Sequence, residues 1–525
     1  MNRALKQSLS SLAEKTLPVE LYTAEQVRAL DRLAIETMPL EGFDLMKQAG
    51  KSAFRVLLRY WPHVKSLAIF CGGGNNGGDG LVIAGLAIQK GLSVQVIMLS
   101  KPESLTGEAA ESWCWLQQLD DSNLTITPWQ LSGSKNGLIE DKAIDEDRAI
   151  EGEVIIDCLL GTGLTGAVRA DYAAAIDAIN LSQKPVLAVD IPSGLCSDTG
   201  RRLGSAVKAQ RTISFIGIKQ GLLTGEAPSF VGELEFDSLG VPDSVFASTT
   251  PNCIRADWQD FKTQLPPREK TAHKGDYGRV LVIGGEHGMA GAALMAAEAV
   301  ARVGAGLIYV ATRPEHVSAC IARCPELMVR GIDSTAHAES MIETADVIVV
   351  GPGLGQGSWG QSLFQKVLQS NKPMIVDADG LNMLAKQSVA ARDNWILTPH
   401  PGEAARLLEC SVETIERDRF KSVVALQKKY GGTVILKGSG TLIANDAMWL
   451  ANTGNPGMAS GGMGDVLSGI LGGLLAQKAI NSEVVAPTAV TLHGEAANLA
   501  TLSVGEYSLL ASDVLDAIPQ LLKAI

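Results

Sequence analysis

Short apolar runs that each end in a loop of glycine and polar residues recur along this chain, and they constrain the fold more than any other feature. Segments with apolar residues at helical spacing lie between these runs. Strands that alternate with helices form βαβ units, in which helices cover both faces of a parallel sheet. The sequence therefore predicts an α/β fold. The predicted strands lie in the runs at residues 66–72, 93–100, 153–161, 185–194, 211–219, 279–285, 307–312, 346–355, 373–380, 394–403 and 432–440.

The alternation of strands and helices is interrupted between residues 228 and 267. Proline, serine and acidic residues cluster there, which favours a connection between domains. A chain of 525 residues is also too long for one ordinary domain. We therefore expect two domains, residues 1–245 and 246–525. Apolar residues at helical spacing predict a helix over residues 21–36.

The composition argues against several classes of partner. Acidic residues outnumber basic ones by 57 to 45, so the net charge is −12, and no basic run suits nucleic acid or an anionic membrane. The N-terminus has no apolar signal region, and no apolar run reaches the roughly 18 residues of a spanning helix. The eight cysteines show neither a disulfide framework nor a CxxC zinc pattern. We expect a soluble cytoplasmic protein with reduced thiols, no nucleic-acid partner and no membrane partner.

A glycine-rich loop at residues 72–80 (GGGNNGGDG) follows a predicted strand and precedes a helix. Backbone N–H groups and the helix dipole make such a turn suitable for a phosphate. A tight structural turn would explain the glycines alone. Asn75, Asn76 and Asp79 add polar groups for a ligand or an ion at the carboxyl end of the strand.

Two more polar loops follow strands in this region. Asp157 ends one strand and precedes GTGLTGA at residues 161–167, and Asp190 ends another strand before Ser193 in DIPSG. Helix capping explains each aspartate equally well when it is taken alone. Because the carboxyl ends of parallel strands meet at one edge of a sheet, three such loops favour a shared site.

The strongest feature of the second half is the loop at residues 452–465 (NTGNPGMASGGMGD), which opens an apolar helix. Its backbone donors and the helix N-terminus suit the charge that develops on a transferred phosphoryl group. Asp465 is expected at the start of the helix, close enough to deprotonate a substrate hydroxyl. An aspartate that only starts a helix would not explain so many glycines.

Other loops of the second half are expected at the same sheet edge. Residues 437–441 (KGSGT) follow a strand and would face nucleotide phosphates, while residues 351–355 (GPGLG) and 377–379 (DAD) complete the edge. His400 in TPHPGE is either a structural histidine or a substrate contact, and the sequence leaves both interpretations open.

In this order, GGGNNGGDG, DCLLGTGLTGA and DIPSG resemble the NAD(P)H-hydrate epimerase domain over roughly residues 20–240. The resemblance implies a potassium ion held by Asn76, Asp157 and Ser193, whose oxygen donors suit this hard cation. It implies that Asp190 contacts the substrate, and we expect its carboxylate to take and return a proton at C6. The implied contacts to the hydrated dinucleotide are Asn75, Asn76, Gly77, Gly78, Asp79, Gly161, Thr162, Gly163, Leu164, Thr165, Gly166, Ala167 and Asp190.

GPGLG, DADGLN, TPHPGE, KGSGT and NPGMASGGMGD resemble the NAD(P)H-hydrate dehydratase domain over roughly residues 260–525, and GMGD resembles the GxGD anion-hole motif of ribokinase-like kinases. The resemblances imply an N-terminal Rossmann-like parallel-sheet domain and a C-terminal ribokinase-like α/β domain. The implied nucleotide contacts are Lys437, Gly438, Ser439, Gly440, Thr441 and Gly464. The implied hydrate contacts are Gly353, Gly355, His400 and Asp465.

Together the two resemblances imply an enzyme that repairs NADHX and NADPHX. The first domain would epimerise the R and S forms at C6 with K⁺. The second would dehydrate the S epimer to NAD(P)H with Mg²⁺ and ADP, releasing AMP and phosphate, and Asp465 would take the hydroxyl proton. A homo-oligomer is expected. The residues alone do not decide between ADP and ATP.

Two other functions stay open at this stage. A small-alcohol kinase for a vitamin or a sugar, fused to a nucleotide-binding domain, would share the GxGD loop and its base. TPHPGE and the epimerase-like first half argue against it. A non-catalytic nucleotide sensor is opposed by Asp190 and Asp465, which lie beside complete glycine loops.

Overall fold

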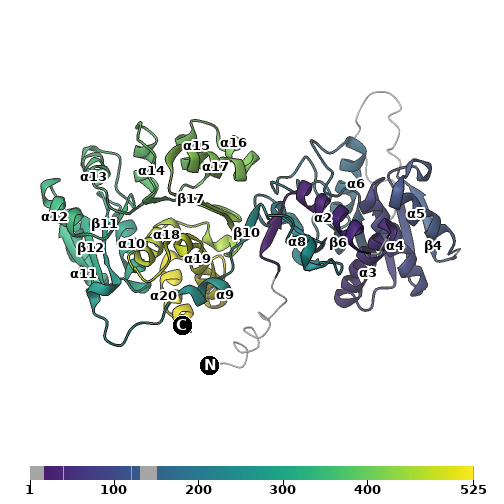
Figure 1. Ribbon diagram of the computed structural model, residues 1–525, viewed down its shortest axis with the longest axis horizontal. Coiled ribbons are helices and arrows are strands. Elements are labelled where there is room, and N and C mark those ends of the chain that lie inside the picture. The colour runs from purple at the N-terminus through teal and green to yellow at the C-terminus, as the bar shows by residue number, and fades with distance from the viewer. Residues whose placement is uncertain (1–16, 39–40, 120, 130–149, 524–525) are drawn as a thin grey trace. The chain divides into compact units, whose positions relative to one another are not determined.

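The structure is a computed structural model that describes residues 17–38, 41–119, 121–129 and 150–523. It divides into two compact units, residues 1–253 and 254–525 (Figure 1). Each unit is built around a largely parallel sheet with helices packed against it, so the predicted α/β class is confirmed.

The N-terminal unit contains a seven-stranded sheet in which every neighbouring pair is parallel. The chain enters at β2, builds outward through β3 and β4, and then builds in the opposite direction from β5. The carboxyl ends of β2 and β5 therefore flank the switch point where such sheets bind ligands. In sheet order the strands are β4 (Leu124–Pro128), β3 (Ser93–Met98), β2 (Ser66–Cys71), β5 (Val154–Cys158), β6 (Val186–Val189), β7 (Arg211–Phe215) and β9 (Glu233–Asp237).

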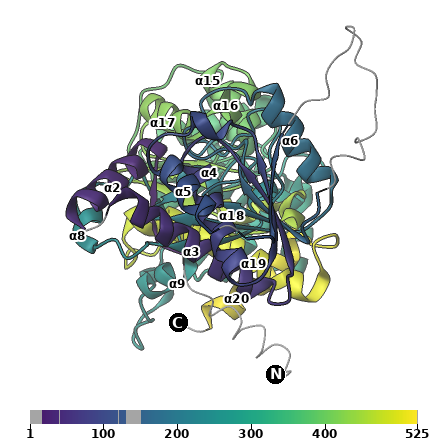
Figure 2. The same ribbon diagram turned by 90° about the vertical axis from the view of Figure 1, so that its right-hand side faces the viewer.

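Alternate residues of β2 enter two different hydrophobic cores. Leu67 and Ile69 pack in the core beneath α3, α4 and α5, whereas Ala68 and Phe70 pack with Ile176 of α6 on the opposite face. Figure 2 shows these helices on the two sides of the sheet. Burial on both faces explains why the strand is apolar throughout. The helices are α2 (Ala24–Thr37), α3 (Gly42–Tyr60), α4 (Asn75–Gln89), α5 (Gly107–Gln117) and α6 (Ala170–Leu181).

Residues 228–267 were predicted to connect the two domains, and this prediction is wrong for the first part of the segment. Residues 233–237 form β9, the edge strand of the N-terminal sheet, which pairs with β7. The strand has the sequence ELEFD and is only partly buried, so it lacks the continuous apolar run of a central strand. The other elements of this segment are α7 (Pro228–Val231), α8 (Asp243–Phe246), β10 (Cys253–Arg255) and α9 (Trp258–Phe261).

The first helix begins later than residue 21. Leu21 and Tyr22 lie in β1 (Glu20–Tyr22), which pairs in parallel with β8 (Ile218–Lys219). Thr23 then caps α2, since its hydroxyl accepts from the Gln26 N–H at 3.2 Å and the Gln26 side chain accepts from the Thr23 N–H at 3.0 Å. This capping box fixes where the helix starts.

The C-terminal unit has a longer, mixed sheet. Its strands are parallel from β13 to β17, and β17, β18 and β19 are antiparallel to one another in turn. Residues 437–440 form the turn between β17 and β18. In sheet order the strands are β13 (Met328–Gly331), β12 (Leu307–Thr312), β11 (Arg279–Ile283), β14 (Val347–Val350), β15 (Met374–Val376), β16 (Trp395–Leu397), β17 (Thr433–Leu436), β18 (Thr441–Ala444), β19 (Met448–Ala451) and β10.

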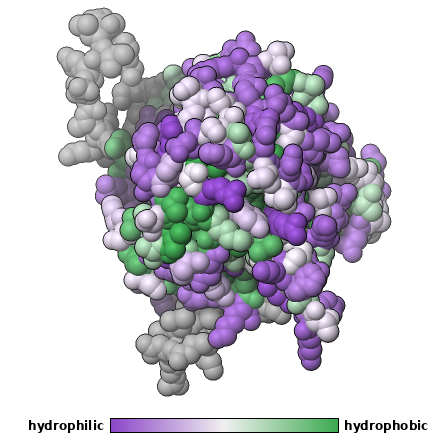
Figure 3. All heavy atoms as spheres, turned by 90° about the vertical axis from the view of Figure 1, so that its left-hand side faces the viewer, coloured by the Kyte–Doolittle hydropathy of each residue, from purple (hydrophilic) through white to green (hydrophobic). Residues whose placement is uncertain are grey.

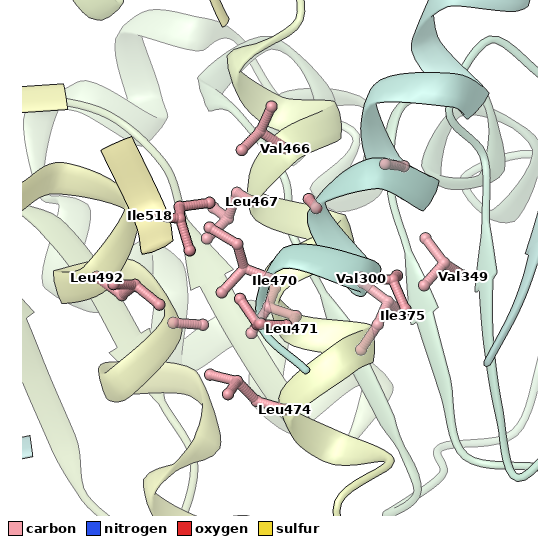
Figure 4. Packing of buried hydrophobic residues seen from close by; sticks show 14 of the residues in the cluster. Val300, Val349, Ile375, Val466, Leu467, Ile470, Leu471, Leu474, Leu492 and Ile518 are labelled. Carbon is pink, nitrogen blue, oxygen red and sulfur yellow. The ribbon is translucent and has the colours of Figure 1, made fainter. Parts of the chain in front are cut away.

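The main core of this unit lies between the sheet and a group of four helices: α10 (Ala290–Arg302), α18 (Met463–Leu475), α19 (Ser482–Val504) and α20 (Ala511–Leu522). Figure 4 shows Ile470 and Leu471 of α18 among Val300, Leu492 and Ile518 from the other three helices. Gly469 brings α18 directly against α10, because a Cβ there would overlap the Ala296 carbonyl oxygen.

The opposite face of the C-terminal sheet carries a second layer of helices, drawn above the sheet in Figure 1. These helices are α13 (Ser358–Gln369), α14 (Ala378–Leu384), α15 (Pro401–Leu408), α16 (Val412–Arg417) and α17 (Arg419–Tyr430). Two further helices, α11 (Val317–Arg323) and α12 (Ala336–Thr344), follow β12 and β13. One face of the molecule is mainly hydrophilic, with hydrophobic side chains gathered in one area (Figure 3). Across the described residues, no helix is both long and apolar enough to cross a membrane.

Candidate active sites

A cavity of about 890 Å³ lies in the N-terminal unit, and its lining includes the loops that follow β2, β5 and β6. The three loops singled out in the sequence therefore meet, as expected from the sheet topology. The predicted binding residues that line this cavity are Asn75, Asn76, Asp79, Gly161, Thr162, Gly163, Leu164, Thr165, Ala167 and Asp190.

Three predicted binding glycines are not among the cavity's lining residues. Gly77 and Gly78 lie in the first turn of α4 and are buried. A Cβ at Gly77 would overlap the Gly72 carbonyl oxygen, and one at Gly78 would come within 2.7 Å of the Met46 side chain. These two glycines allow α4 to pack closely. Gly166 has a φ of +98°, so the loop there uses the left-handed backbone conformation that favours glycine.

Asp157 and Ser193 form a buried hydrogen-bonded pair behind the cavity. The Ser193 hydroxyl donates to Asp157 Oδ1 at 2.6 Å, and the Ser193 N–H donates to Oδ2 at 2.8 Å. The Leu159 N–H donates to Oδ1 at 3.2 Å. Burial raises the pKa of Asp157 to about 6, and these hydrogen bonds oppose the rise.

Asn76 lies beside this pair and has one unsatisfied oxygen. Its Nδ2 donates to the Leu160 carbonyl at 3.1 Å, while its Oδ1 is buried and has no hydrogen-bond partner among the residues that the structure describes. The Leu160 N–H in turn donates to the Ser193 hydroxyl at 2.8 Å. A buried amide oxygen without a donor is costly unless something binds it. Amide, carboxylate and hydroxyl oxygens in this arrangement fit a hard cation.

Asp190 is held in an unusual conformation at the carboxyl end of β6. Its φ is +68°, in the left-handed region that few non-glycine residues adopt, and its side chain is 18% exposed. The ammonium of Lys219 forms an ion pair with Asp190 and donates to the Ser214 hydroxyl at 3.1 Å and the Phe215 carbonyl at 3.3 Å. Lys219 was missing from the sequence prediction because it lies in an apolar run that predicts only a strand.

Two more aspartates line the same cavity. Burial and the neighbouring charge of Asp190 raise the pKa of Asp79 well above its ordinary value. Burial also raises the pKa of Asp31, on α2, to about 6, with Lys219 opposing the rise. Asp31 was not predicted either, since helical spacing alone does not show that α2 faces the cavity.

The second candidate site lies at the start of α18. Gly462 precedes the helix with a φ of +94°, and Asp465 lies in the first turn. A Cβ at Gly464 would lie 3.3 Å from the Lys437 ammonium nitrogen and 3.6 Å from Asp377 Oδ2. Because Gly464 has no side chain, space remains beside the Lys437 ammonium at the helix N-terminus, where backbone donors also point.

The charges at this site are strongly coupled. Lys437 Nζ lies 2.9 Å from Asp377 Oδ1 and 3.9 Å from Glu403 Oε2. Burial lowers the pKa of Lys437, but these carboxylates outweigh it, so the pKa lies above its ordinary value. Burial and Asp377 raise the pKa of Asp465 to about 7. Asp465 is therefore suited to accept a proton near neutral pH.

His400 caps α15. Its Nδ1 accepts from the Gly402 N–H at 3.0 Å and the Glu403 N–H at 3.4 Å, and the Glu403 side chain accepts from the His400 N–H at 2.8 Å. Burial, Lys437 and Arg406 lower the pKa of His400. This gives the histidine a structural role at Nδ1, while the ring remains half-exposed. Burial raises the pKa of Glu403 to about 7.

The remaining predicted glycines lie in tight turns. Gly353 and Gly355 have φ values of +55° and +71°, and the Gly355 N–H donates to the Asp379 carboxylate at 2.9 Å. Gly438 and Gly440 have φ values of +138° and +63° in the turn after Lys437.

A buried arginine supports the same turn. Arg419 donates to the Leu436 carbonyl at 3.3 Å and the Lys437 carbonyl at 3.2 Å, and Glu416 balances its charge at 2.9 Å. Thr441 Oγ1 donates to the Gly438 carbonyl at 3.1 Å. Ser439 lies between Gly438 and Gly440 at the tip of the turn. Arg419 was not predicted, because an arginine in a helical pattern is usually exposed.

Two family models match the chain. The model described as YjeF-related protein N-terminus matches residues 42–221, and the model described as NAD(P)H-hydrate dehydratase matches residues 280–520. The first span contains the three loops of the first candidate site but not Asp31, and the second span contains the second candidate site. The predicted pair of α/β domains agrees with both matches.

Similar proteins cover nearly the whole chain. The bifunctional NAD(P)H-hydrate repair enzyme Nnr of Coxiella burnetii is 46% identical over 94% of this chain and 97% of its own length. Its counterpart in Escherichia coli is 41% identical over 96% of this chain and 94% of its own length. A solved ADP/ATP-dependent NAD(P)H-hydrate dehydratase from Bacillus subtilis, co-crystallised with ATP and Mg²⁺, is 32% identical over 51% of this chain and 98% of that one, with a TM-score of 0.48. Given the full-length similarity, the chain belongs to the family of bifunctional NAD(P)H-hydrate repair enzymes.

Proposed function

We propose that this protein repairs hydrated nicotinamide dinucleotides at two separate sites. Residues 1–245 epimerise NADHX and NADPHX at C6, and residues 246–525 dehydrate the S epimer to NAD(P)H with ADP, releasing AMP and phosphate. The observation that carries the proposal is that one chain of this family contains a candidate site in each of its two units. The rival kinase function does not account for the first site.

The epimerase site would hold K⁺ at Asn76, Asp157 and Ser193. The unsatisfied Asn76 Oδ1 beside the buried Asp157 carboxylate supports this assignment. When bound, the ion would supply positive charge near the dinucleotide. Asp190, with its carboxylate at the cavity, would take and return the proton at the hydroxylated carbon. The loop at residues 161–167 would orient the substrate.

The dehydratase site would use Asp465 as its base. Asp465 takes the proton from the C6 hydroxyl as the oxygen attacks the terminal phosphoryl group of ADP, and AMP leaves. Phosphorylation turns a poor leaving group into a good one, so phosphate can then leave C6 while a proton is lost to solvent from the adjacent ring carbon and the ring double bond forms. Mg²⁺ would accompany the polyphosphate and neutralise its charge. Lys437 and the backbone donors of Gly438, Ser439, Gly440, Thr441 and Gly464 would bind the nucleotide, and Gly353, Gly355 and His400 would contact the hydrate.

We also propose that the enzyme works in the cytoplasm. All eight cysteines lie in the described residues, and none of them forms a disulfide bond there, which supports a reducing cytoplasmic location. We further propose that the enzyme is a homo-oligomer that acts on small molecules without a nucleic-acid or membrane partner. The net charge of −12 supports the last two points.

The test of this function uses the full chain and an epimeric mixture of NADH hydrate. We expect the absorbance of reduced nicotinamide to rise only when ADP or ATP is added with Mg²⁺, and both epimers to be consumed. Comparing the two nucleotides identifies the preferred donor. Consumption of one epimer alone would contradict the epimerase assignment. No rise with either nucleotide would contradict the dehydratase assignment and would direct a screen of small alcohols.

A further inference from the structure

Asp377 connects the loops of the second site. It follows β15 and is only 1% exposed, yet its carboxylate accepts three side-chain hydrogen bonds. Thr398 Oγ1 and Lys437 Nζ donate to Oδ1 at 2.8 and 2.9 Å, and Ser468 Oγ donates to Oδ2 at 2.8 Å. Thr398 follows β16, Lys437 follows β17, and Ser468 lies in α18. One buried carboxylate therefore ties two neighbouring strand ends to the helix that carries Asp465.

Packing alone does not account for a carboxylate at this position. Removing a carboxylate from water is costly, and an apolar side chain would fill the same space at lower cost. The countercharge is Lys437, whose ammonium faces the space left by Gly464 at the start of α18. Asp465 is the next residue along this helix. The ion pair therefore lies between the predicted nucleotide turn and the predicted base.

We propose that Asp377 is a positioning residue of the dehydratase site: it fixes the Lys437 ammonium in front of the nucleotide turn, and through Ser468 it holds its negative charge against the helix that carries Asp465. This inference rests on the proposed function, in which Asp465 is the base. The ion pair is formed by Asp377 and Lys437. The other charged and titratable groups near it are Asp465, Glu403, His400, Arg406 and His493.

The electrostatics agree with the geometry. After burial, the Asp377 charge is the main cause that raises the pKa of Asp465, and Lys437 opposes it. Removing the negative charge of Asp377 would therefore lower the pKa of Asp465. It would also release Lys437 from its fixed position, so nucleotide binding would weaken. A residue that served only packing would change stability without moving the pH dependence.

The experiment measures ADP-dependent dehydration by Asp377→Asn across a pH series, with the intact chain. We expect the acid limb of the kcat/KM profile to move to lower pH and the KM for ADP to rise on the order of tenfold, the factor for one hydrogen bond to a charged group. Ser468→Ala and Thr398→Val each remove one hydrogen bond but keep the carboxylate charge. We expect both to leave the acid limb at the wild-type pH. Glu413→Gln removes an exposed carboxylate from α16 and should change neither quantity.

The outcomes separate this inference from the function on which it rests. An inactive wild-type protein would refute the proposed dehydratase function itself. An active wild type whose acid limb and KM for ADP are both unchanged in Asp377→Asn would overturn the role of Asp377. Thermal unfolding shows whether Asp377→Asn folds. If it does not, Ser468→Ala and Thr398→Val decide: unchanged kcat and KM for ADP in both variants would overturn the inference.

Discussion

The Ser193 hydroxyl lies 2.6 Å from Asp157 Oδ1, and the backbone N–H of the same serine lies 2.8 Å from Oδ2. One residue thus satisfies both oxygens of a buried carboxylate from a neighbouring strand end. Asn76 Oδ1, by contrast, receives no hydrogen bond from any described residue. This contrast allows the proposed cation site to be tested by thermodynamic linkage.

Asp157→Asn should remove the response of the N-terminal unit to potassium. A cation that binds only the folded state raises its melting temperature by mass action. We expect KCl to stabilise the wild-type unit more than LiCl of equal ionic strength, and we expect no difference between the salts in Asp157→Asn. Epimerisation should be lost in the variant and dehydration retained. Equal stabilisation of the variant by KCl would count against this site.

The pH dependence of this unit follows from the same carboxylate. The pKa of Asp157 is raised from 3.8 to about 6, so the folded state holds this proton more tightly than the unfolded state. The bound proton therefore stabilises the folded state fully below pH 3.8, and this stabilisation is lost as the pH rises through about 6. The loss lowers the free energy of unfolding by about 3 kcal/mol. Potassium favours the ionised carboxylate and should reduce this loss. Unfolding in urea between pH 4 and about 7, with and without KCl, measures the effect.

Lys219→Met should damage the first site alone. The change leaves Asp190 without its buried partner, which typically costs about 3 kcal/mol or more of stability. We expect epimerisation to fall on the order of a hundredfold and dehydration to be unchanged. Lys90→Met, at the exposed end of α4, is the matched control and should retain both activities. A variant that epimerises normally would show that Lys219 does not position Asp190.

Asp465→Asn should abolish dehydration and leave epimerisation intact. An amide cannot accept the hydroxyl proton, so we expect a loss on the order of a thousandfold. In the wild type, dehydration should rise with pH through about 7, because Asp465 must be ionised to act as a base. Loss of both activities in a variant that still unfolds cooperatively would disprove the division into two sites.

Gly469→Val should destabilise the C-terminal unit. A Cβ at this position overlaps the Ala296 carbonyl of α10, so the two helices must move apart. We expect a loss of about 3 kcal/mol in urea unfolding. Gly291→Ala in α10 has open space around it and should not destabilise the unit, since alanine is the better helix former. Similar losses in both variants would argue against close packing as the cause.

The sequence predicted most of what positions the two sites, because buried parallel strands and their glycine loops have strong local signals. All the predicted apolar runs contain strands, and the loops after β2, β5 and β6 meet at one cavity. β9 was missed because a half-exposed edge strand mixes charged and apolar residues. Two residues that act on the candidate catalytic aspartates are brought to them by contacts between distant segments: Lys219 pairs with Asp190, and Asp377 lies near Asp465. No local pattern shows such contacts.

Each candidate site is assembled from residues of a single unit, one on either side of residue 253. Under the proposed function, one round of translation therefore produces one epimerase site and one dehydratase site. Their ratio stays at one to one at every level of expression. The capacity to form the S epimer then scales with the capacity to consume it, without any separate control of two proteins.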